Sequence, residues 1–162
     1  MNNKFAITVV LSTLLLIGAG VWLGSTMQKP EVAMSGESQA DVPETVHDWG
    51  TIPLTGGEVT KSFPITNSGT QTLQLHDIST SCMCTTAQLT INDQTSPQFG
   101  MHQKSAWVGK IEPGQTAQLI VVFDPAFHGP SGVGSITRQI TAQTNDPNHP
   151  TLNFNLTAQV IN

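Results

Sequence analysis

Residues 59–78, VTKSFPITNSGTQTLQLHDI, decide the fold class of this chain. On either side of the central Asn-Ser-Gly-Thr, apolar side chains alternate with polar ones, which is typical of half-buried β-strands. The polar, glycine-containing tetrapeptide between the two runs is typical of a tight turn. The alternation of Leu73 and Leu75 slips by one position at Ile78, which predicts a β-bulge just before the cysteines. The stretch therefore predicts two strands separated by a turn.

Similar strand-like runs continue in both directions, with Gly, Pro and Asn turn signals between them. Beside residues 59–67 and 71–78, the predicted strands are residues 46–53, 82–91, 117–124, 136–143 and 152–160. Seven short strands at this spacing, with no helical pattern after residue 45, are typical of a β-sandwich. The fold class predicted for residues 45–162 is therefore all-β, as a seven-stranded sandwich.

The composition excludes several classes of function. Only 10% of the 162 residues are charged, the net charge is −5, and Lys and Arg do not cluster. Nucleic-acid binding is excluded, because neutralising phosphates needs a basic surface. The sequence has no G-x-S-x-G motif, phosphate-binding loop, paired catalytic carboxylates or nucleotide fingerprint. We therefore expect neither enzymatic activity nor a small organic substrate.

Residues 5–23, FAITVVLSTLLLIGAGVWL, form an uncharged apolar run that follows Lys4. As a helix this run would reach ~29 Å, close to the ~30 Å hydrocarbon thickness of a membrane. A cleaved signal peptide remains an alternative, although its apolar region is usually only ~7–15 residues long. We predict a signal anchor over residues 1–24, a single-pass transmembrane helix in the inner (cytoplasmic) membrane. The N-terminus would be cytoplasmic, and the domain periplasmic or extracellular.

Residues 25–44 separate this run from the predicted sandwich. They are rich in Ser, Gly, Pro and acidic residues and have no apolar periodicity. Such a segment cannot bury enough apolar surface to fold, so it is predicted to be a flexible linker.

Four motifs in order resemble a known bacterial family. They are HDWGTI at residues 47–52, FPITNSGTQTLQLHDISTSC-x-CT at 63–85, IEPGQTAQLIVVFDP at 111–125 and TNDPNHP at 144–150. The set is similar to the family called domain of unknown function 1573, whose members resemble the ASH and Hydin domains of eukaryotic cilia and centrosomes. The resemblance covers about residues 45–161 and implies an exported, immunoglobulin-like sandwich. It implies no reaction, because a fold does not define a function.

Cys82 and Cys84 are the only cysteines of the chain. If they open the strand of residues 82–91, both sulfurs point to the same face. Extended Cα atoms at this spacing lie ~6.6 Å apart, at the limit for a disulfide. Two adjacent sulfur donors therefore favour a soft metal, foremost copper. A structural disulfide and a redox-active thiol pair remain alternatives.

Two long irregular loops carry further candidate ligands. Residues 92–110 contain Met101 and His102, and residues 125–134 contain His128. Loops from different hairpins gather at the ends of an immunoglobulin-like sandwich, so both loops could approach the cysteines. Thiolate, imidazole and thioether groups together select Cu(I) or, less specifically, Zn(II). The predicted metal ligands are Cys82, Cys84, His102 and His128, with Met101 as a weak axial donor.

Arg138 shares its strand parity with Ile136 and Ile140. Its side chain is therefore expected to point inward near the loop that carries His128, with Asp124 as the partner of its charge.

These predictions indicate a membrane-anchored extracytoplasmic domain that binds copper through a Cys-x-Cys pair, in metal handling or delivery. One alternative is a non-catalytic immunoglobulin-like module that binds another protein of the cell envelope. A second alternative is a thiol–disulfide redox protein.

Overall fold

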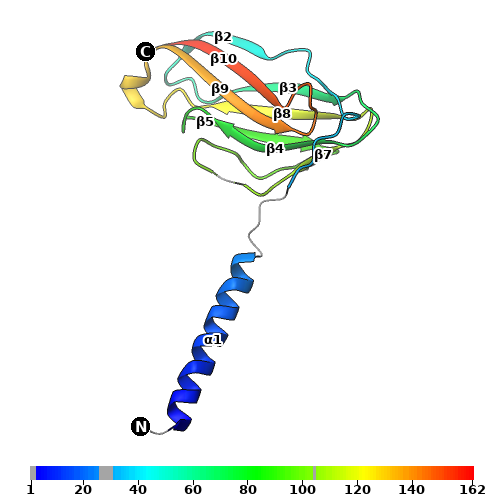
Figure 1. Ribbon diagram of the computed structural model, residues 1–162. Coiled ribbons are helices and arrows are strands. Elements are labelled where there is room, and N and C mark those ends of the chain that lie inside the picture. Colours follow the sequence, from blue (N-terminus) through cyan, green and yellow to red (C-terminus); the bar gives the residue numbers. More distant parts are fainter. Residues whose placement is uncertain (1–2, 26–30, 104) are drawn as a thin grey trace. The chain divides into compact units, whose positions relative to one another are not determined.

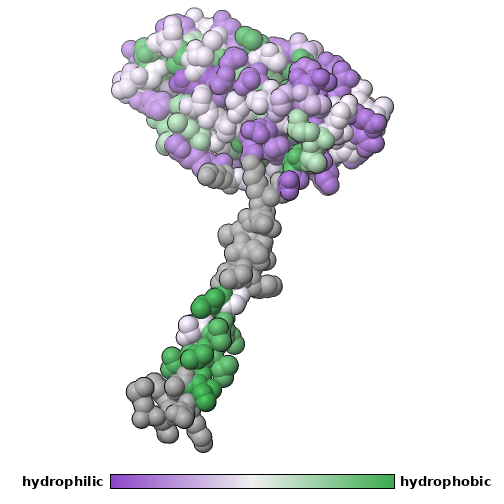
Figure 2. Space-filling model, in the orientation of Figure 1, coloured by the Kyte–Doolittle hydropathy of each residue, from purple (hydrophilic) through white to green (hydrophobic). Residues whose placement is uncertain are grey.

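The computed structural model describes residues 3–25, 31–103 and 105–162, and the chain divides into two units, Met1–Glu31 and Val32–Asn162. The first unit contains helix α1 (Asn3–Ser25), so the predicted N-terminal helix is confirmed. The side chains described in α1 are those of residues 7–19, and they are mainly apolar (Figure 2). No helix within the described residues is both long and apolar enough to cross a membrane, so the predicted transmembrane character is not supported.

The described residues of the second unit form ten strands in two sheets (Figure 1). The strands are β1 (Ala40–Asp41), β2 (Val46–Pro53), β3 (Val59–Asn67), β4 (Leu73–Thr80), β5 (Thr85–Ile91), β6 (Gln94–Thr95), β7 (Gly109–Ile111), β8 (Thr116–Phe123), β9 (Gly134–Thr144) and β10 (Thr151–Ile161). A 3₁₀ turn, η1 (Gly129–Gly132), lies between β8 and β9. One sheet has the order β1-β3-β8-β5-β6, and the other has the order β2-β10-β9-β4-β7.

The seven longer strands correspond to the seven predicted from sequence, and the two-sheet all-β architecture is confirmed. The core forms between the sheets because the alternating apolar side chains of each strand face inward. Phe63 of β3 and Phe154 of β10 are fully buried and meet across the two sheets, with ring centroids 4.9 Å apart. Burying each such side chain stabilises the fold by about 1.5–3 kcal/mol.

The predicted β-bulge in β4 is confirmed. The register between β4 and β9 shifts between His76 and Ser79, and Asp77 adopts a φ of 50°. The extra residue lets Leu75 and Ile78 both face the core, although they are three positions apart. After the bulge, β4 pairs with β9 again at Ser79 and Thr80, just before the two cysteines.

The sandwich begins before residue 45, within the segment predicted to be a linker. β1 pairs with β3, the Ser35 amide donates to the Asn145 carbonyl at 2.8 Å, and Ser38 is 1% exposed. These backbone contacts hold the segment on the sandwich although it has no apolar periodicity. Residues 26–30 of the predicted linker lie outside the described residues.

Candidate functional site

Cys82 and Cys84 lie in a turn between β4 and β5 rather than in a strand, because β5 begins only at Thr85. The Thr85 amide donates to the Cys82 carbonyl at 3.1 Å and closes the turn. The buried hydroxyl of Thr80 lies 3.0 Å from the Cys82 carbonyl oxygen and 2.9 Å from that of Thr85. The prediction that the cysteines open the strand was therefore wrong.

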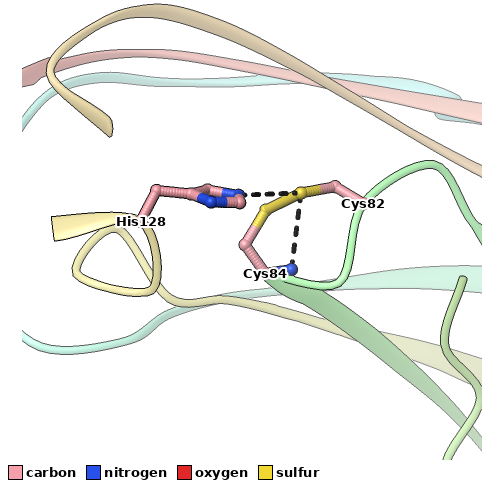
Figure 3. A group of neighbouring side chains, drawn as sticks. All are labelled: Cys82, Cys84 and His128. Carbon is pink, nitrogen blue, oxygen red and sulfur yellow. Dashed lines mark hydrogen bonds between the residues drawn. A yellow bond between two sulfur atoms is a disulfide. The ribbon is translucent and has the colours of Figure 1, made fainter. Parts of the chain in front are cut away.

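The two sulfurs are joined in a disulfide (Figure 3). The turn brings the Cα atoms of Cys82 and Cys84 to 5.3 Å, within the usual range for a disulfide. An extended backbone would separate these Cα atoms by ~6.6 Å, and the sequence-based preference for a metal over a disulfide rested on that separation. The backbone folds back on itself here, so the two sulfurs are close enough to bond.

The two cysteines differ in burial. Cys84 is 3% exposed and packs in a small apolar cluster with Phe123, Ile136 and Val160. Its carbonyl accepts a hydrogen bond at 2.9 Å from the Asp124 amide, at the end of β8. Cys82 is only partly buried. The pair therefore has one sulfur-bearing residue inside the sandwich and one at its surface.

His128 reaches the disulfide from the loop after β8. The Asp124 carboxylate accepts from the Ala126 amide at 2.8 Å, and the Gly129 amide donates to the Ala126 carbonyl at 2.8 Å, so the loop folds back tightly. This loop places Nε2 of His128 3.4 Å from Sγ of Cys82 (Figure 3). The His128 ring is exposed and packs edge-on against Phe127.

Three of the five predicted metal ligands therefore come together. The sulfur atoms of Cys82 and Cys84 and a ring nitrogen of His128 all lie within 4.8 Å of one another. The residues come from two loops at one end of the sandwich, as expected for hairpins that meet there.

Met101 and His102 lie elsewhere, in a pocket beside β4 and β9 that Asp77 and Gln143 also line. Both residues are exposed. Their loop is held at the open edge of β5, where Phe99 exchanges two backbone hydrogen bonds with Ala87, and it ends at β7, the edge strand beside β4. The loop therefore covers the side of the sandwich between the two sheet edges, whereas the cysteines lie in the turn that ends β4.

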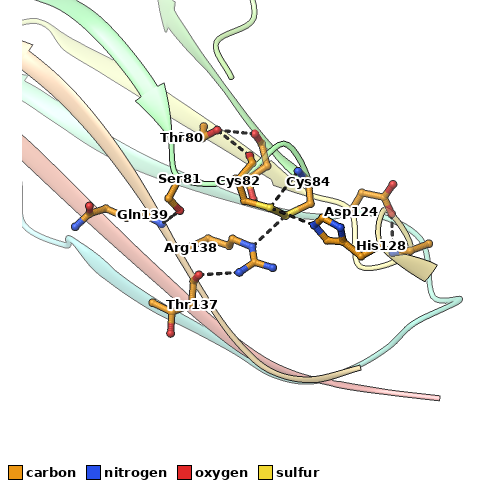
Figure 4. Close-up of a disulfide and its surroundings, with 11 residues drawn as sticks. Thr80, Ser81, Cys82, Cys84, Asp124, His128, Thr137, Arg138 and Gln139 are labelled. Carbon is orange, nitrogen blue, oxygen red and sulfur yellow. Dashed lines mark hydrogen bonds between the residues drawn. A yellow bond between two sulfur atoms is a disulfide. The ribbon is translucent and has the colours of Figure 1, made fainter. Parts of the chain in front are cut away.

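Arg138 is a site residue that was not among the predicted ligands. Its Nε atom donates to Sγ of Cys84 at 3.1 Å, and a terminal nitrogen donates to the Thr137 carbonyl at 2.8 Å (Figure 4). The guanidinium lies 5.3 Å from the centre of the Phe123 ring. Desolvation by partial burial lowers the pKa of Arg138 below its ordinary value.

The ion pairs among the described residues do not include one between Arg138 and Asp124, so the expected partner is replaced by a sulfur atom. The alternation of side chains in β9 correctly predicted that Arg138 points inward. The sulfur of Cys84 could not be predicted as its partner, because that contact depends on the turn that buries Cys84.

The sequence of this chain matches a known protein family over part of its length. Residues 40–99 match the family described as protein of unknown function, DUF1573. The resemblance inferred from sequence motifs is confirmed over these residues. The DUF1573 match includes both cysteines, whereas His128 and Arg138 lie outside it.

Solved structures are similar to this chain at low sequence identity. A protein of unknown function from Porphyromonas gingivalis W83 matches with a TM-score of 0.60 and 24% identity, over 78% of this chain and 50% of that chain. This chain therefore spans half the length of that protein. The ASH/PapD-like domain 7 of human CEP192 matches with a TM-score of 0.48 and 18% identity, over 83% of this chain and 93% of that chain. A search of curated proteins gives no match.

Proposed function

We propose that the reduced domain binds one copper(I) ion through Cys82, Cys84 and His128 and acts without catalysis in copper handling or delivery. One observation carries the proposal: the three ligand atoms lie within 4.8 Å of one another. With metal–sulfur distances of ~2.3 Å and metal–nitrogen distances of ~2.0 Å, ligand atoms around one ion lie roughly 3.5–4 Å apart. Small side-chain rotations would therefore complete a three-coordinate site once the sulfurs are separated.

The choice of copper(I) over zinc(II) follows from softness and charge. Thiolates and imidazole both bind copper(I), and thiolates favour soft ions. Two thiolates, a neutral imidazole and Cu⁺ carry one net negative charge, which the guanidinium of Arg138 balances at 3.1 Å from Cys84. With Zn²⁺ the same ligands are neutral, and the partly buried cation of Arg138 would lose its counter-charge.

The disulfide sets a condition on binding. The thiolate is the form of cysteine that binds metals, so the bond between Cys82 and Cys84 must be reduced first. The oxidised domain is expected not to bind copper.

A titration of the full chain tests the proposal. The reduced protein, freed of reductant under anaerobic conditions, would compete for copper(I) with a chromogenic chelator. We expect one ion per chain, and loss of that binding in Cys82→Ser, Cys84→Ser and His128→Ala. His102→Ala is the matched control, because it removes an exposed loop histidine from a different pocket. Absence of stoichiometric binding by the reduced chain, or equal loss in the control, would contradict the proposal.

We further propose that the domain is tethered outside the cytoplasm by the uncharged run of residues 5–23, which continues beyond the side chains described in α1. Such a run suits the inner membrane, with Lys4 on the cytoplasmic side. The expected result is that the chain stays with membranes during alkaline extraction and that external protease removes the sandwich from spheroplasts. Release by alkaline extraction would contradict the anchor.

A second candidate function is protein interaction within the cell envelope. Met83 and Phe127, which directly neighbour the site residues in sequence, are 56% and 46% exposed. Contiguous exposed apolar patches often mark interaction sites, and these two side chains are candidates for part of such a patch. This function predicts that a double Cys→Ser chain still captures its partner, whereas Met83→Ser with Phe127→Ser does not. Copper delivery predicts instead that the chain with both cysteines replaced by serine no longer functions.

A further inference from the structure

We infer that the Cys82–Cys84 disulfide exchanges with an external dithiol, with Cys82 as the sulfur that is attacked and Cys84 as the sulfur that leaves. This activity requires no metal and goes beyond the proposed copper site. Two features carry the inference: the unequal burial of the cysteines and the cation at Cys84.

Unequal burial decides which sulfur reacts. Cys82 is partly buried in a surface turn next to the exposed Met83, whereas Cys84 is 3% exposed. An incoming thiolate must contact the sulfur that it attacks, and reaction rates depend on that access. Attack is therefore directed to Cys82, and the electron pair of the broken bond goes to Cys84.

Arg138 is placed to stabilise the sulfur that leaves. Its Nε donates to Sγ of Cys84 at 3.1 Å, and the contacts with the Thr137 carbonyl and the Phe123 ring hold the guanidinium in place. A neutral disulfide sulfur is a weak acceptor and compensates little for the desolvation of a cation. A thiolate at the same position forms a charge-assisted hydrogen bond, which is about twice as strong as a neutral one. The surroundings of Cys84 therefore suit the reduced state better than the oxidised one.

The exchange balances in two steps. One thiolate of the external dithiol attacks Sγ of Cys82, forms a mixed disulfide and releases Cys84 as a thiolate beside Arg138. The second sulfur of the dithiol, as a thiolate, then attacks the first dithiol sulfur, which is bonded to Cys82; the dithiol closes to a disulfide and Cys82 is released. Cys82 takes up a proton from solvent, to which the second thiol of the dithiol has released its own, and the ring of His128 lies beside the released sulfur, with Nε2 3.4 Å from Sγ of Cys82. The dithiol loses two electrons and becomes a disulfide, and the domain gains both.

The first test measures the redox equilibrium of the full chain with a chelator present, so that its outcome is independent of copper. The protein is equilibrated with mixtures of reduced and oxidised dithiothreitol, and free thiols are counted by mass after alkylation. We expect reversible reduction, and an equilibrium shifted at least about tenfold toward the disulfide in Arg138→Gln, because a charge-assisted bond is lost. Arg138→Lys keeps a cation and should therefore return the equilibrium most of the way to the wild-type value. Lys61→Gln, which removes a cation paired with Glu44, should cause no shift. An unchanged equilibrium in folded Arg138→Gln would overturn the role of Arg138 in stabilising the Cys84 thiolate.

The second test identifies the attacked sulfur. With Cys84→Ser, the remaining Cys82 should form a mixed disulfide with oxidised dithiothreitol or with a small aromatic disulfide. With Cys82→Ser, the buried Cys84 should react many-fold more slowly. Equal rates in the two folded variants would overturn the assignment. A reduced Cys-x-x-Cys peptide that reduces the wild-type domain faster than dithiothreitol would identify a polypeptide dithiol as the partner, and equal rates would identify a small dithiol.

Discussion

Replacing Asp146 by Asn should detach the segment that precedes β2 from the sandwich and destabilise the domain. Asp146 is fully buried, and its carboxylate accepts three hydrogen bonds. The Ala40 amide and Nδ1 of His149 each lie 3.0 Å from Oδ2, and the Asn148 amide lies 2.8 Å from Oδ1. The Ala40 bond joins β1 to the turn between β9 and β10.

The magnitude follows from these three bonds. Asparagine has one oxygen and one NH₂ group, so at least one of the three N–H groups would face another donor. Leaving one buried donor unsatisfied costs about 1–3 kcal/mol, and loss of the charge weakens each remaining bond by about 1 kcal/mol. The sum is about 3–5 kcal/mol. For a domain of this size, that loss should lower Tm by about 10–20 °C.

Burial alone would raise the pKa of Asp146, but the hydrogen bonds from Ala40, His149 and Asn148 outweigh it, and the net pKa is lowered. A carboxyl with a lower pKa in the folded state contributes stability above its unfolded pKa. That contribution is lost as the pH falls through the folded value. The difference between wild type and Asp146→Asn should therefore be largest near neutral pH and shrink below about 3.8, the ordinary value.

Urea unfolding followed by circular dichroism between pH 7 and pH 2.5 would measure this difference. Asp48→Asn is the matched control, because Asp48 is exposed and accepts one hydrogen bond, from the Gly50 amide at 2.9 Å. It should change stability by less than about 0.5 kcal/mol. A loss below about 1 kcal/mol in Asp146→Asn, or a loss that is independent of pH, would refute the reasoning.

Three further substitutions test the packing, each measured by urea unfolding. Phe154→Ala should cost about 3–5 kcal/mol, because it removes a ring that packs on Phe63 in the middle of the core. Trp49→Phe should cost less than about 1 kcal/mol, because the buried Nε1 of Trp49 has no hydrogen-bond partner among the described residues, so its loss offsets the smaller ring. Gly69→Ala should cost about 1–3 kcal/mol, because its Cβ would collide with the Glu37 carbonyl and the Gln39 amide, which are backbone atoms.

The strands could be predicted because alternation is a local signal. Phe63 and Ile65, or Leu73 and Leu75, face the core in the structure as their parity requires. The bulge was also predictable, because the slip at Ile78 is visible in the same pattern.

The turn at the cysteines could not be read in the same way. Cys84 and Ala87 are both buried although they are three residues apart, which no single strand phase allows. The backbone accommodates both because the Thr80 hydroxyl satisfies the carbonyls of Cys82 and Thr85 and so replaces sheet hydrogen bonds at this point. The sequence does not show that a strand threonine will bond these two carbonyls. The cysteines were therefore predicted to lie in the strand that follows them, although they lie in the turn before it.

The part of the sandwich against which each long loop packs was the feature hardest to predict. His128 and His102 both lie in long loops and look alike in sequence, yet only His128 reaches the cysteines. The difference comes from Phe99, which fixes the loop of His102 to the edge of β5 through a long-range pairing with Ala87. Such pairings depend on the assembled sheet, so the identity of the third ligand required the structure.

The position of Arg138 connects the proposed copper site with the proposed exchange reaction. Both need negative charge on Cys84, as a metal ligand in one case and as a leaving group in the other, and Arg138 is the cation that contacts this sulfur. The two activities use the same sulfur atoms, so they cannot operate at once. A metal-bound pair has no disulfide to exchange, and an oxidised pair has no thiolate to bind copper. Reduction of Cys82–Cys84 would therefore control copper binding. Loss of Arg138 should lower the affinity for copper(I) and also shift the redox equilibrium toward the disulfide. A substitution that affects only the metal site should lower the affinity for copper(I) and leave the redox equilibrium unchanged.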